Sequence, residues 1–323
     1  MKFVQRVENT VQKIEYFVQK IKRHQDVFRK VLGRMMVFYV FYIDKSFEAI
    51  TFIFLQVIMI GIIPQIYYSS MKGKTIFITG ATSGIGEGCA RKFASAGCRL
   101  ILNGRNVEKL ETLKREFVLS GCEVLTLPFD VRNREAMKLA LDSLQGEWKN
   151  IDILINNAGL VIGLDKEHEG SLDEWDVVID TNIKGVLAMT RMIVPGMVER
   201  QCGHIINIGS VAGDAAYAGG SVYCATKAAV KALSDGLRID LVDTPLRVTN
   251  IKPGLVETNF SVVRFRGDKS KADAVYKGIR PLTGDDIAEV VYYAASAPAH
   301  VQIAEVLVMP TYQANGTVCH RDL

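Results

Sequence analysis

The sequence lacks the closely spaced cysteines and histidines of structural metal sites and disulfide frameworks. Its six cysteines are scattered over 323 residues, none forms a Cys-x-x-Cys pair, and only five histidines are present. Zinc sites and disulfide-rich domains need such ligands at regular spacing. We therefore expect free thiols in a reducing compartment and no bound metal.

Most of the chain also lacks an excess of basic residues. The net charge is +4, but residues 1–34 hold nine Lys/Arg against three Asp/Glu, which leaves −2 for the rest of the chain. Proteins that bind nucleic acids need a basic surface that neutralises phosphates. We therefore expect no nucleic-acid partner.

Residues 1–34 have few features of a removable targeting segment. They contain no serine, hold three acidic residues and have no apolar core near the start, unlike a mitochondrial presequence or a signal peptide. Apolar residues from Val4 to Leu32 instead recur in alternating steps of three and four between basic residues, which predicts a basic amphipathic helix. Such a helix would bind a membrane surface or a partner helix, or else pack on its own domain.

A long apolar run occurs within residues 35–71. Residues 47–68 form 22 mostly apolar positions with one early glutamate, and a helix of that length spans about 33 Å against a hydrocarbon core of about 30 Å. We predict one transmembrane helix here, in the mitochondrial inner membrane or the endoplasmic reticulum. A re-entrant hairpin over residues 35–68, or a hydrophobic arm buried in a larger assembly, would also account for the run.

A β-rich run, a glycine-rich turn and a helix follow one another from residue 75. Residues 75–79 predict a strand, Gly80, Gly84 and Gly86 lie in the turn, and residues 87–96 predict the helix. Glycines let a backbone approach a phosphate closely, and a helix N-terminus favours its negative charge. This order of elements predicts a dinucleotide site.

No carboxylate follows the next predicted strand, residues 99–102, which runs into Asn103-Gly104-Arg105. An acidic residue at this point would bind the ribose hydroxyls of NAD, whereas an arginine can pair with the additional phosphate of NADP. Arg105 therefore favours NADP over NAD. The alternative is an arginine that is simply solvated at the surface.

Strands alternate with helical segments through the rest of the chain. We expect further strands at 123–127, 151–155, 204–208 and 247–251. The pattern predicts an α/β fold, a single domain over residues 72–323 with a doubly wound (Rossmann) parallel sheet. Ligands of such sheets lie beyond the carboxyl ends of the strands, where Asn156, Ser210 and Pro253 fall.

The residues best suited to chemistry are Ser210, Tyr223 and Lys227. Tyr223 and Lys227 are four apart in an alanine-rich helical segment, so they share one helix face. A phenol with an ordinary pKa of about 10 needs a shift of roughly three units to act as acid or base near neutrality. One ammonium about 4 Å away, at an effective dielectric of about 20, would supply about that much. Ser210 could hold a substrate oxygen against the phenol.

These motifs together resemble the short-chain dehydrogenase/reductase family in order and spacing over about residues 72–310. They are Thr79-Gly80-x-x-x-Gly84-x-Gly86, Asn156-Asn157-Ala158-Gly159, Asn182, Ser210, Tyr223-x-x-x-Lys227 and Pro253-Gly254. The resemblance implies that Tyr223 is the acid/base and that Lys227 lowers its pKa and holds the nicotinamide ribose. It also implies that Ser210 orients the substrate oxygen and that Asn182 anchors a water of the proton relay.

The same resemblance implies an NADP site with a defined set of residues. The set is Gly80, Thr82, Ser83, Gly84, Ile85, Gly86, Arg105, Asp130, Val131, Asn157, Ala158, Gly159, Tyr223, Lys227, Pro253, Gly254, Val256 and Thr258.

Within the family, the chain is similar to the NADP-dependent 3-hydroxy acid dehydrogenases, also called serine or allo-threonine dehydrogenases. The similar stretches are residues 197–200, 203–209, 217–220, 263–268 and 298–301. A hydroxy acid carries a carboxylate, and Arg264 and Arg266 are the cations in the segment expected to cover the substrate. They could equally be solvent-facing arginines of a mobile loop. The members of this subgroup are soluble, so the apolar segment leaves localisation and assembly open.

The family commonly forms tetramers with three perpendicular two-fold axes. Residues 69–73 alone separate the predicted span from the first strand, a reach of about 17 Å. Four N-termini in such a tetramer could not all meet one flat bilayer. We therefore expect a homodimer, or a single copy in a larger membrane complex.

Three functions fit these observations. The first is a membrane-anchored NADP-dependent oxidoreductase that acts on a small 3-hydroxy acid or related alcohol. The second is an accessory subunit of a large membrane complex that retains the dehydrogenase fold. The third is a reductase of lipid-like carbonyls delivered from the bilayer.

Overall fold

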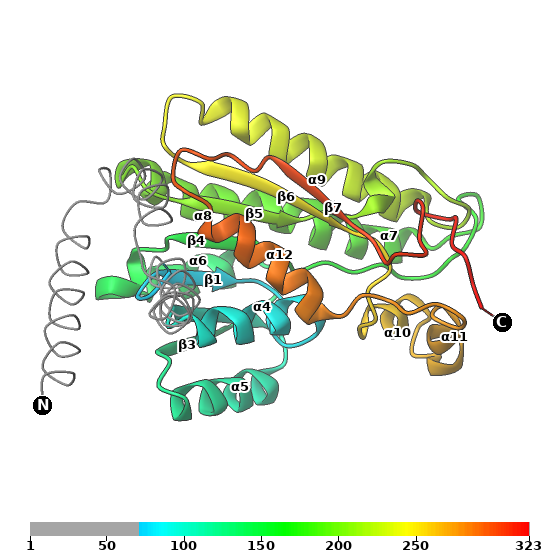
Figure 1. Cartoon of the computed structure of the whole chain (residues 1–323), viewed down its shortest axis with the longest axis horizontal. Coiled ribbons are helices and arrows are strands. Elements are labelled where there is room, and N and C mark those ends of the chain that lie inside the picture. The colour runs from blue at the N-terminus through cyan, green and yellow to red at the C-terminus, as the bar shows by residue number, and fades with distance from the viewer. Residues whose placement is uncertain (1–70, 323) are drawn as a thin grey trace, which may run out of the picture. The chain divides into compact units, whose positions relative to one another are not determined.

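The computed structural model describes residues 71–322, which form one α/β unit (Figure 1). Its centre is a sheet of seven parallel strands in the order β3-β2-β1-β4-β5-β6-β7. The strands are β1 Thr75–Ile78, β2 Arg99–Gly104, β3 Val124–Pro128, β4 Ile153–Asn156, β5 His204–Ile208, β6 Arg247–Pro253 and β7 Glu305–Val308. The predicted doubly wound parallel sheet is confirmed, and its strand order reverses between β1 and β4.

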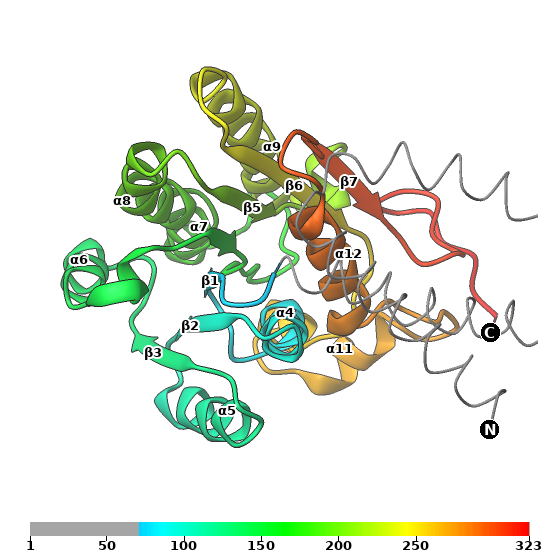
Figure 2. The same cartoon turned by 60° about the vertical axis from the view of Figure 1, so that its left-hand side comes forward.

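Helices cover both faces of the sheet (Figure 2). The helices before the fourth strand are α4 Gly84–Ser95, α5 Val107–Leu119 and α6 Arg134–Asp142, followed by the short 3-10 helix η1 Gly146–Lys149. Those up to the sixth strand are α7 Leu172–Ile179, the π-helical turn η2 Asp180–Lys184, α8 Gly185–Glu199, the 3-10 turn η3 Val211–Gly213 and α9 Ser221–Asp240. Those beyond the sixth strand are α10 Phe260–Arg264, α11 Lys269–Ala274 and α12 Gly284–Ser296.

Two apolar cores lie on the opposite faces of the sheet. Side chains alternate in direction along a strand, so Ile76 and Ile78 of β1 pack with α4, α5 and α12, whereas Phe77 packs with α6 and α8. The central strands are buried on both faces, which is why they are almost continuously apolar. The edge strand β7 is half exposed, and its short sequence did not predict it.

The predicted membrane and amphipathic helices, at residues 47–68 and 1–34, lie outside the described residues. Within residues 71–322, no helix is long and apolar enough to cross a bilayer.

The turn after β1 is fastened to the turn after β4. The Asn157 side-chain amide donates hydrogen bonds to the carbonyl oxygens of Thr79 (2.9 Å) and Gly80 (3.0 Å), and the Thr79 hydroxyl accepts from the backbone N–H of Asn157 (3.0 Å). Gly86 lies so close that a Cβ there would be 2.2 Å from the Gly80 oxygen and 2.5 Å from Asn157 Nδ2. Close packing of α4 on this turn therefore requires glycine at position 86.

We predict that Gly86→Ala destabilises the fold by about 1–3 kcal/mol, the usual cost of forcing extra atoms into a packed site. Gly236→Ala is the matched control, because Gly236 is also helical and a Cβ there would meet no atom within 4 Å. Alanine favours a helix over glycine by roughly 0.5–1 kcal/mol, so the control should be neutral or stabilising. Urea unfolding of the two variants gives the comparison, and equal stability would contradict the proposed packing.

Candidate active site

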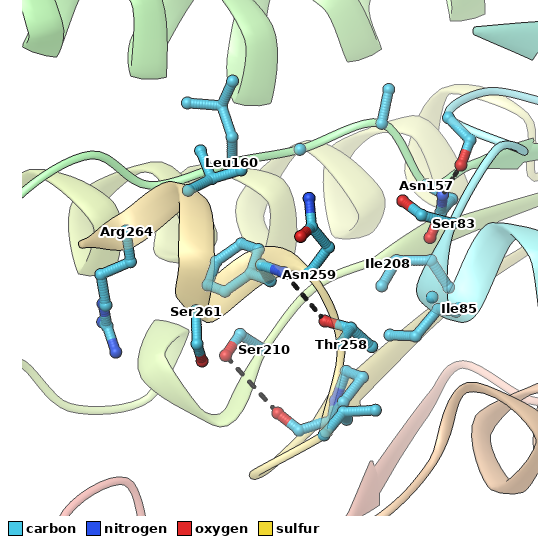
Figure 3. A pocket seen from close by; sticks show the side chains of 18 of the residues that line it. Ser83, Ile85, Asn157, Leu160, Ile208, Ser210, Thr258, Asn259, Ser261 and Arg264 are labelled. Atoms are coloured by element: carbon cyan, nitrogen blue, oxygen red, sulfur yellow. Dashed lines mark hydrogen bonds between the residues drawn. The ribbon is translucent and has the colours of Figure 1, made fainter. Parts of the chain in front are cut away.

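A cleft of about 550 Å³ opens at the carboxyl ends of the strands. Its lining comes from the turns after the first six strands, from α9 and α10, and from the C-terminal loop. Figure 3 shows part of it, with residues of the turns after β1, β4, β5 and β6 and of α10. The predicted residues that line it are Gly80, Thr82, Ser83, Gly84, Ile85, Arg105, Asp130, Val131, Asn157, Ala158, Gly159, Ser210, Tyr223, Lys227, Pro253, Gly254, Val256, Thr258 and Arg264. Gly86, Asn182 and Arg266 do not line it.

The backbone around this cleft fits a dinucleotide. A Cβ at Gly84 would lie 2.8 Å from the Thr258 side chain, and one at Gly104 would lie 2.8 Å from the Thr82 methyl group. Gly80 and Gly84 have positive φ angles of 65° and 55°, which glycine adopts without steric cost. The turn therefore presents bare backbone at the start of α4, as phosphate binding requires.

The far end of the cleft carries the cations that an additional phosphate would need. Arg105 is 63% exposed at its side chain and lies 3.8 Å from the Asp130 carboxylate. Lys109, which the sequence did not single out, lines the same end. Asp130 is held by Arg132, whose hydrogen bond lowers the pKa of Asp130. The exposed guanidinium of Arg105 at the rim of the cleft could therefore bind the additional phosphate of NADP.

Asn182 lies beneath the cleft in the π-helical turn η2. Its side-chain amide donates to the Leu160 oxygen (2.8 Å) and to the Thr226 hydroxyl (3.0 Å), and its oxygen accepts from the Leu160 N–H (2.9 Å). These bonds tie the loop after β4 to α9. The structure therefore gives Asn182 a positioning role. That Asn182 also anchors a water of the proton relay remains a prediction.

Ser210, Tyr223 and Lys227 converge at the centre of the cleft. Lys227 Nζ donates to the Ile208 oxygen over 2.8 Å and lies 5.8 Å from the centre of the Tyr223 ring. The Ser210 hydroxyl is 3.5 Å from the Pro253 oxygen and accepts from the Ala212 N–H over 3.1 Å. All three side chains are buried. The predicted trio is thus assembled from the end of β5 and one face of α9.

The electrostatics of Tyr223 differ from the sequence prediction. Burial raises the pKa of Tyr223 above its usual value of 10, and contacts with the Ser210 hydroxyl and the Arg264 charge offset this only in part. Burial also lowers the pKa of Lys227 to about 8. In the protein without cofactor, the pKa of Tyr223 is therefore raised and not lowered as expected. The reason is that desolvation disfavours both the phenolate of Tyr223 and the ammonium of Lys227.

The two candidate arginines have different surroundings. Arg264 lines the cleft, its guanidinium carbon lies 5.5 Å from the Tyr217 ring centre and 5.9 Å from that of Tyr223, and it donates to the Tyr217 hydroxyl. Its Nε is buried without a hydrogen-bond partner. Arg266 instead pairs with Asp165 and Glu174 away from the cleft. We therefore retain Arg264 alone as the candidate substrate cation.

Several lining residues were not singled out from the sequence. Tyr217 stacks on Arg264, and Ser261 and Tyr276 share a hydrogen bond of 2.6 Å. Tyr276 also donates to the Val256 oxygen over 2.9 Å. Gln313 reaches the cleft from beyond β7. Tyr217 lies in residues 217–220, a stretch similar to the 3-hydroxy acid dehydrogenases, and could have been identified from the sequence. No sequence feature pointed to Gln313.

Comparison with known proteins agrees with this site. The family model described as short chain dehydrogenase matches residues 74–268. The NADP-dependent 3-hydroxy acid dehydrogenase of Salmonella typhi is 50% identical over 248 residues, which cover 76% of this chain and 99% of that protein. The enzyme of the same name from Schizosaccharomyces pombe is 44% identical over 256 residues, covering 78% and 98%.

Solved structures show the same similarity. The closed form of serine dehydrogenase complexed with NADP+ has 48% sequence identity and a TM-score of 0.72, covering 77% of this chain and all of that one. An alcohol dehydrogenase from Thermococcus sibiricus complexed with 5-hydroxy-NADP has 27% identity and a TM-score of 0.66, covering 75% and 98%. The chain therefore belongs to the short-chain dehydrogenase family.

Proposed function

We propose that this short-chain dehydrogenase uses NADP to interconvert a small 3-hydroxy acid and its 3-oxo acid. The observation that carries the proposal is the position of Arg264, which lines the cleft, faces the Tyr223 ring and forms no ion pair with an acidic side chain of residues 71–322. A guanidinium without an acidic partner can bind a substrate carboxylate through a charge-assisted hydrogen bond. The names of the relatives support the same substrate class.

The residues of the cleft divide the chemistry among them. In the oxidative direction, Tyr223 as phenolate takes the proton of the substrate hydroxyl, and in the reductive direction it returns that proton to the carbonyl oxygen. Ser210 donates a hydrogen bond to the same oxygen and holds it against the phenol. NADP, when bound, accepts or supplies the hydride.

For this chemistry, the positive charge of Lys227 must offset the rise in the pKa of Tyr223 that burial causes. Its pKa of about 8 leaves the ammonium mostly charged at neutral pH. The charge favours the phenolate, and burial in a medium of low dielectric strengthens that effect. The 2.8 Å bond to the Ile208 oxygen holds the ammonium of this α9 residue at the end of β5.

We predict that Tyr223→Phe lowers kcat for 3-hydroxy acids about a thousandfold, within the usual range for a lost acid/base, and changes NADPH affinity far less, because the aromatic ring remains in the cleft. Tyr293→Phe is the matched control, since Tyr293 is exposed on α12 and does not line the cleft. Steady-state kinetics with NADP-linked absorbance and nucleotide titration measure both. If the unaltered protein bound nucleotide but turned over no hydroxy acid or ketone, the accessory-subunit hypothesis would replace ours.

We predict that Arg264→Ala raises KM for a 3-hydroxy acid roughly 10- to 100-fold, as expected for a lost charge-assisted hydrogen bond. KM for an uncharged alcohol of the same size should change little. Arg266→Ala is the matched control, because that guanidinium pairs with Asp165 and Glu174 outside the cleft. Equal effects of the two substitutions on KM would rule out Arg264 as the carboxylate-binding residue.

We also propose that residues 47–68 anchor the protein in a membrane, of the mitochondrial inner or endoplasmic reticulum type, as a homodimer or as one copy in a larger complex. The support is the length and apolar character of this run.

The full chain should accordingly stay in the membrane pellet after alkaline carbonate extraction. A variant with both Ile58→Asp and Ile60→Asp should be released, since each acidic residue near the centre of a span costs about 3 kcal/mol. Release of the unaltered chain by carbonate would disprove an integral anchor.

A further inference from the structure

The chain beyond β7 forms a compact loop beside the cleft. This C-terminal loop, residues 309–322, folds through three backbone hydrogen bonds, from Gln313 to Pro310 (2.9 Å), from Ala314 to Val318 (2.9 Å) and from His320 to Tyr312 (2.8 Å). Gln313, Gly316 and Thr317 line the cleft itself. The loop therefore contributes to the site from a part of the chain that carries none of the family motifs.

Gln313 connects this loop to the turn after β6. The residue is 5% exposed, its Oε1 accepts from the Leu255 N–H over 2.8 Å, and its Nε2 donates to the Asn315 oxygen over 2.9 Å. A Cβ at Gly254 would lie 2.3 Å from the same Oε1. Glycine at position 254 therefore leaves room for the Gln313 amide.

The turn held by Gln313 contacts Ser210, which holds the substrate oxygen in the proposed mechanism. The Ser210 hydroxyl has the Pro253 oxygen as its acceptor at 3.5 Å, two residues before Leu255 (Figure 3). Gly254 is also fixed to β7 by its N–H, which donates to the Val308 oxygen over 2.7 Å. The position of the Pro253 oxygen, and through it that of Ser210, depends on how this turn is fastened.

The other end of the loop is bound to the lobe that carries Arg264, which comprises residues 260–278. Arg321 donates from its side chain to the Lys277 oxygen over 2.6 Å, and the Asp322 N–H donates to the Gly278 oxygen over 2.8 Å. Lys277 and Gly278 follow α11, on the segment that brings Arg264, Ser261 and Tyr276 to the cleft. One loop thus joins the two walls between which the substrate would lie.

We propose that Gln313 is a positioning residue for the substrate end of the cleft, and that the C-terminal loop sets the spacing between Ser210 and the lobe bearing Arg264. The expected effect on turnover of a 3-hydroxy acid rests on the proposed function, whereas the expected effect on the mobility of the turn at Leu255 does not. We place the effect at the end of the cleft where the substrate would meet the nicotinamide, because Gln313 contacts the turn beside Ser210, which also holds the predicted NADP residues Pro253 and Gly254, and lies away from the Arg105 end.

The test compares Gln313→Leu with Gln302→Leu in the full chain. Gln302 is the control, because its amide also bonds to the backbone, accepting from the Val248 N–H (3.2 Å) and donating to the Val248 oxygen (2.7 Å), but at the start of β6 and away from the cleft. We expect Gln313→Leu to lower kcat/KM for a 3-hydroxy acid about tenfold, the effect of one lost hydrogen bond. NADPH affinity should fall less than kcat/KM does, and Gln302→Leu should leave both values unchanged.

Amide hydrogen exchange provides a readout that does not require turnover. In Gln313→Leu, the Leu255 amide should exchange faster than in the unaltered chain and in Gln302→Leu. This difference would support the positioning role even if the unaltered protein oxidised no hydroxy acid. Identical kinetics and identical Leu255 exchange in the two variants would overturn the proposal.

A shortened chain covers the case in which Gln313→Leu does not fold. Removing residues 321–323 deletes the contacts to Lys277 and Gly278 and, within the loop, the His320–Asp322 side-chain contact. We expect a several-fold higher KM for the hydroxy acid and faster exchange at residues 277–279, with unchanged NADPH binding. Unchanged KM and unchanged exchange would overturn the proposed tie between loop and lobe.

Discussion

The hydrogen bond from the Lys227 ammonium to the Ile208 carbonyl joins α9 to the end of β5 in the interior of the cleft. Burial at this point lowers the pKa of Lys227 to about 8 and raises that of Tyr223. A charged ammonium can remain there because the strand end provides an acceptor and the phenol ring lies 5.8 Å away. The reactivity of the site therefore depends on a balance between desolvation, which disfavours the phenolate, and one nearby positive charge, which favours it.

The parallel sheet makes this arrangement possible by bringing the ends of its strands to one edge. Side-chain amides then fix the turns to one another: Asn157 binds the turn after β1, and Asn182 binds the loop after β4 to α9. The substrate side is built differently, from the short helices α10 and α11 and from the C-terminal loop. The nucleotide side is thus part of the sheet framework, whereas the substrate side depends on contacts between separate segments.

The sequence predicted what depends on periodicity and motif spacing. It identified the sheet, the glycine turn and the trio around Tyr223, because each lies in a regular element or at its end. It could not separate Arg264 from Arg266, because the difference arises after α10, where Arg266 takes a φ of 53° and joins Asp165 and Glu174 instead of the cleft. It also gave the wrong direction for the pKa of Tyr223, since burial is not visible in residue spacing. Gln313 was missed because its contacts join parts of the chain 58 residues apart.

The most direct test of this balance is the pH dependence of kcat for hydroxy acid oxidation at saturating NADP, compared between the unaltered protein and Lys227→Met. One charge 5.8 Å from the phenol ring contributes roughly 3 kcal/mol at an effective dielectric of about 20, or about two pKa units. When the Lys227 charge is removed, the account predicts that the apparent pKa governing oxidation rises by about one to two units. An unchanged apparent pKa in Lys227→Met would show that Lys227 does not control the ionisation of Tyr223.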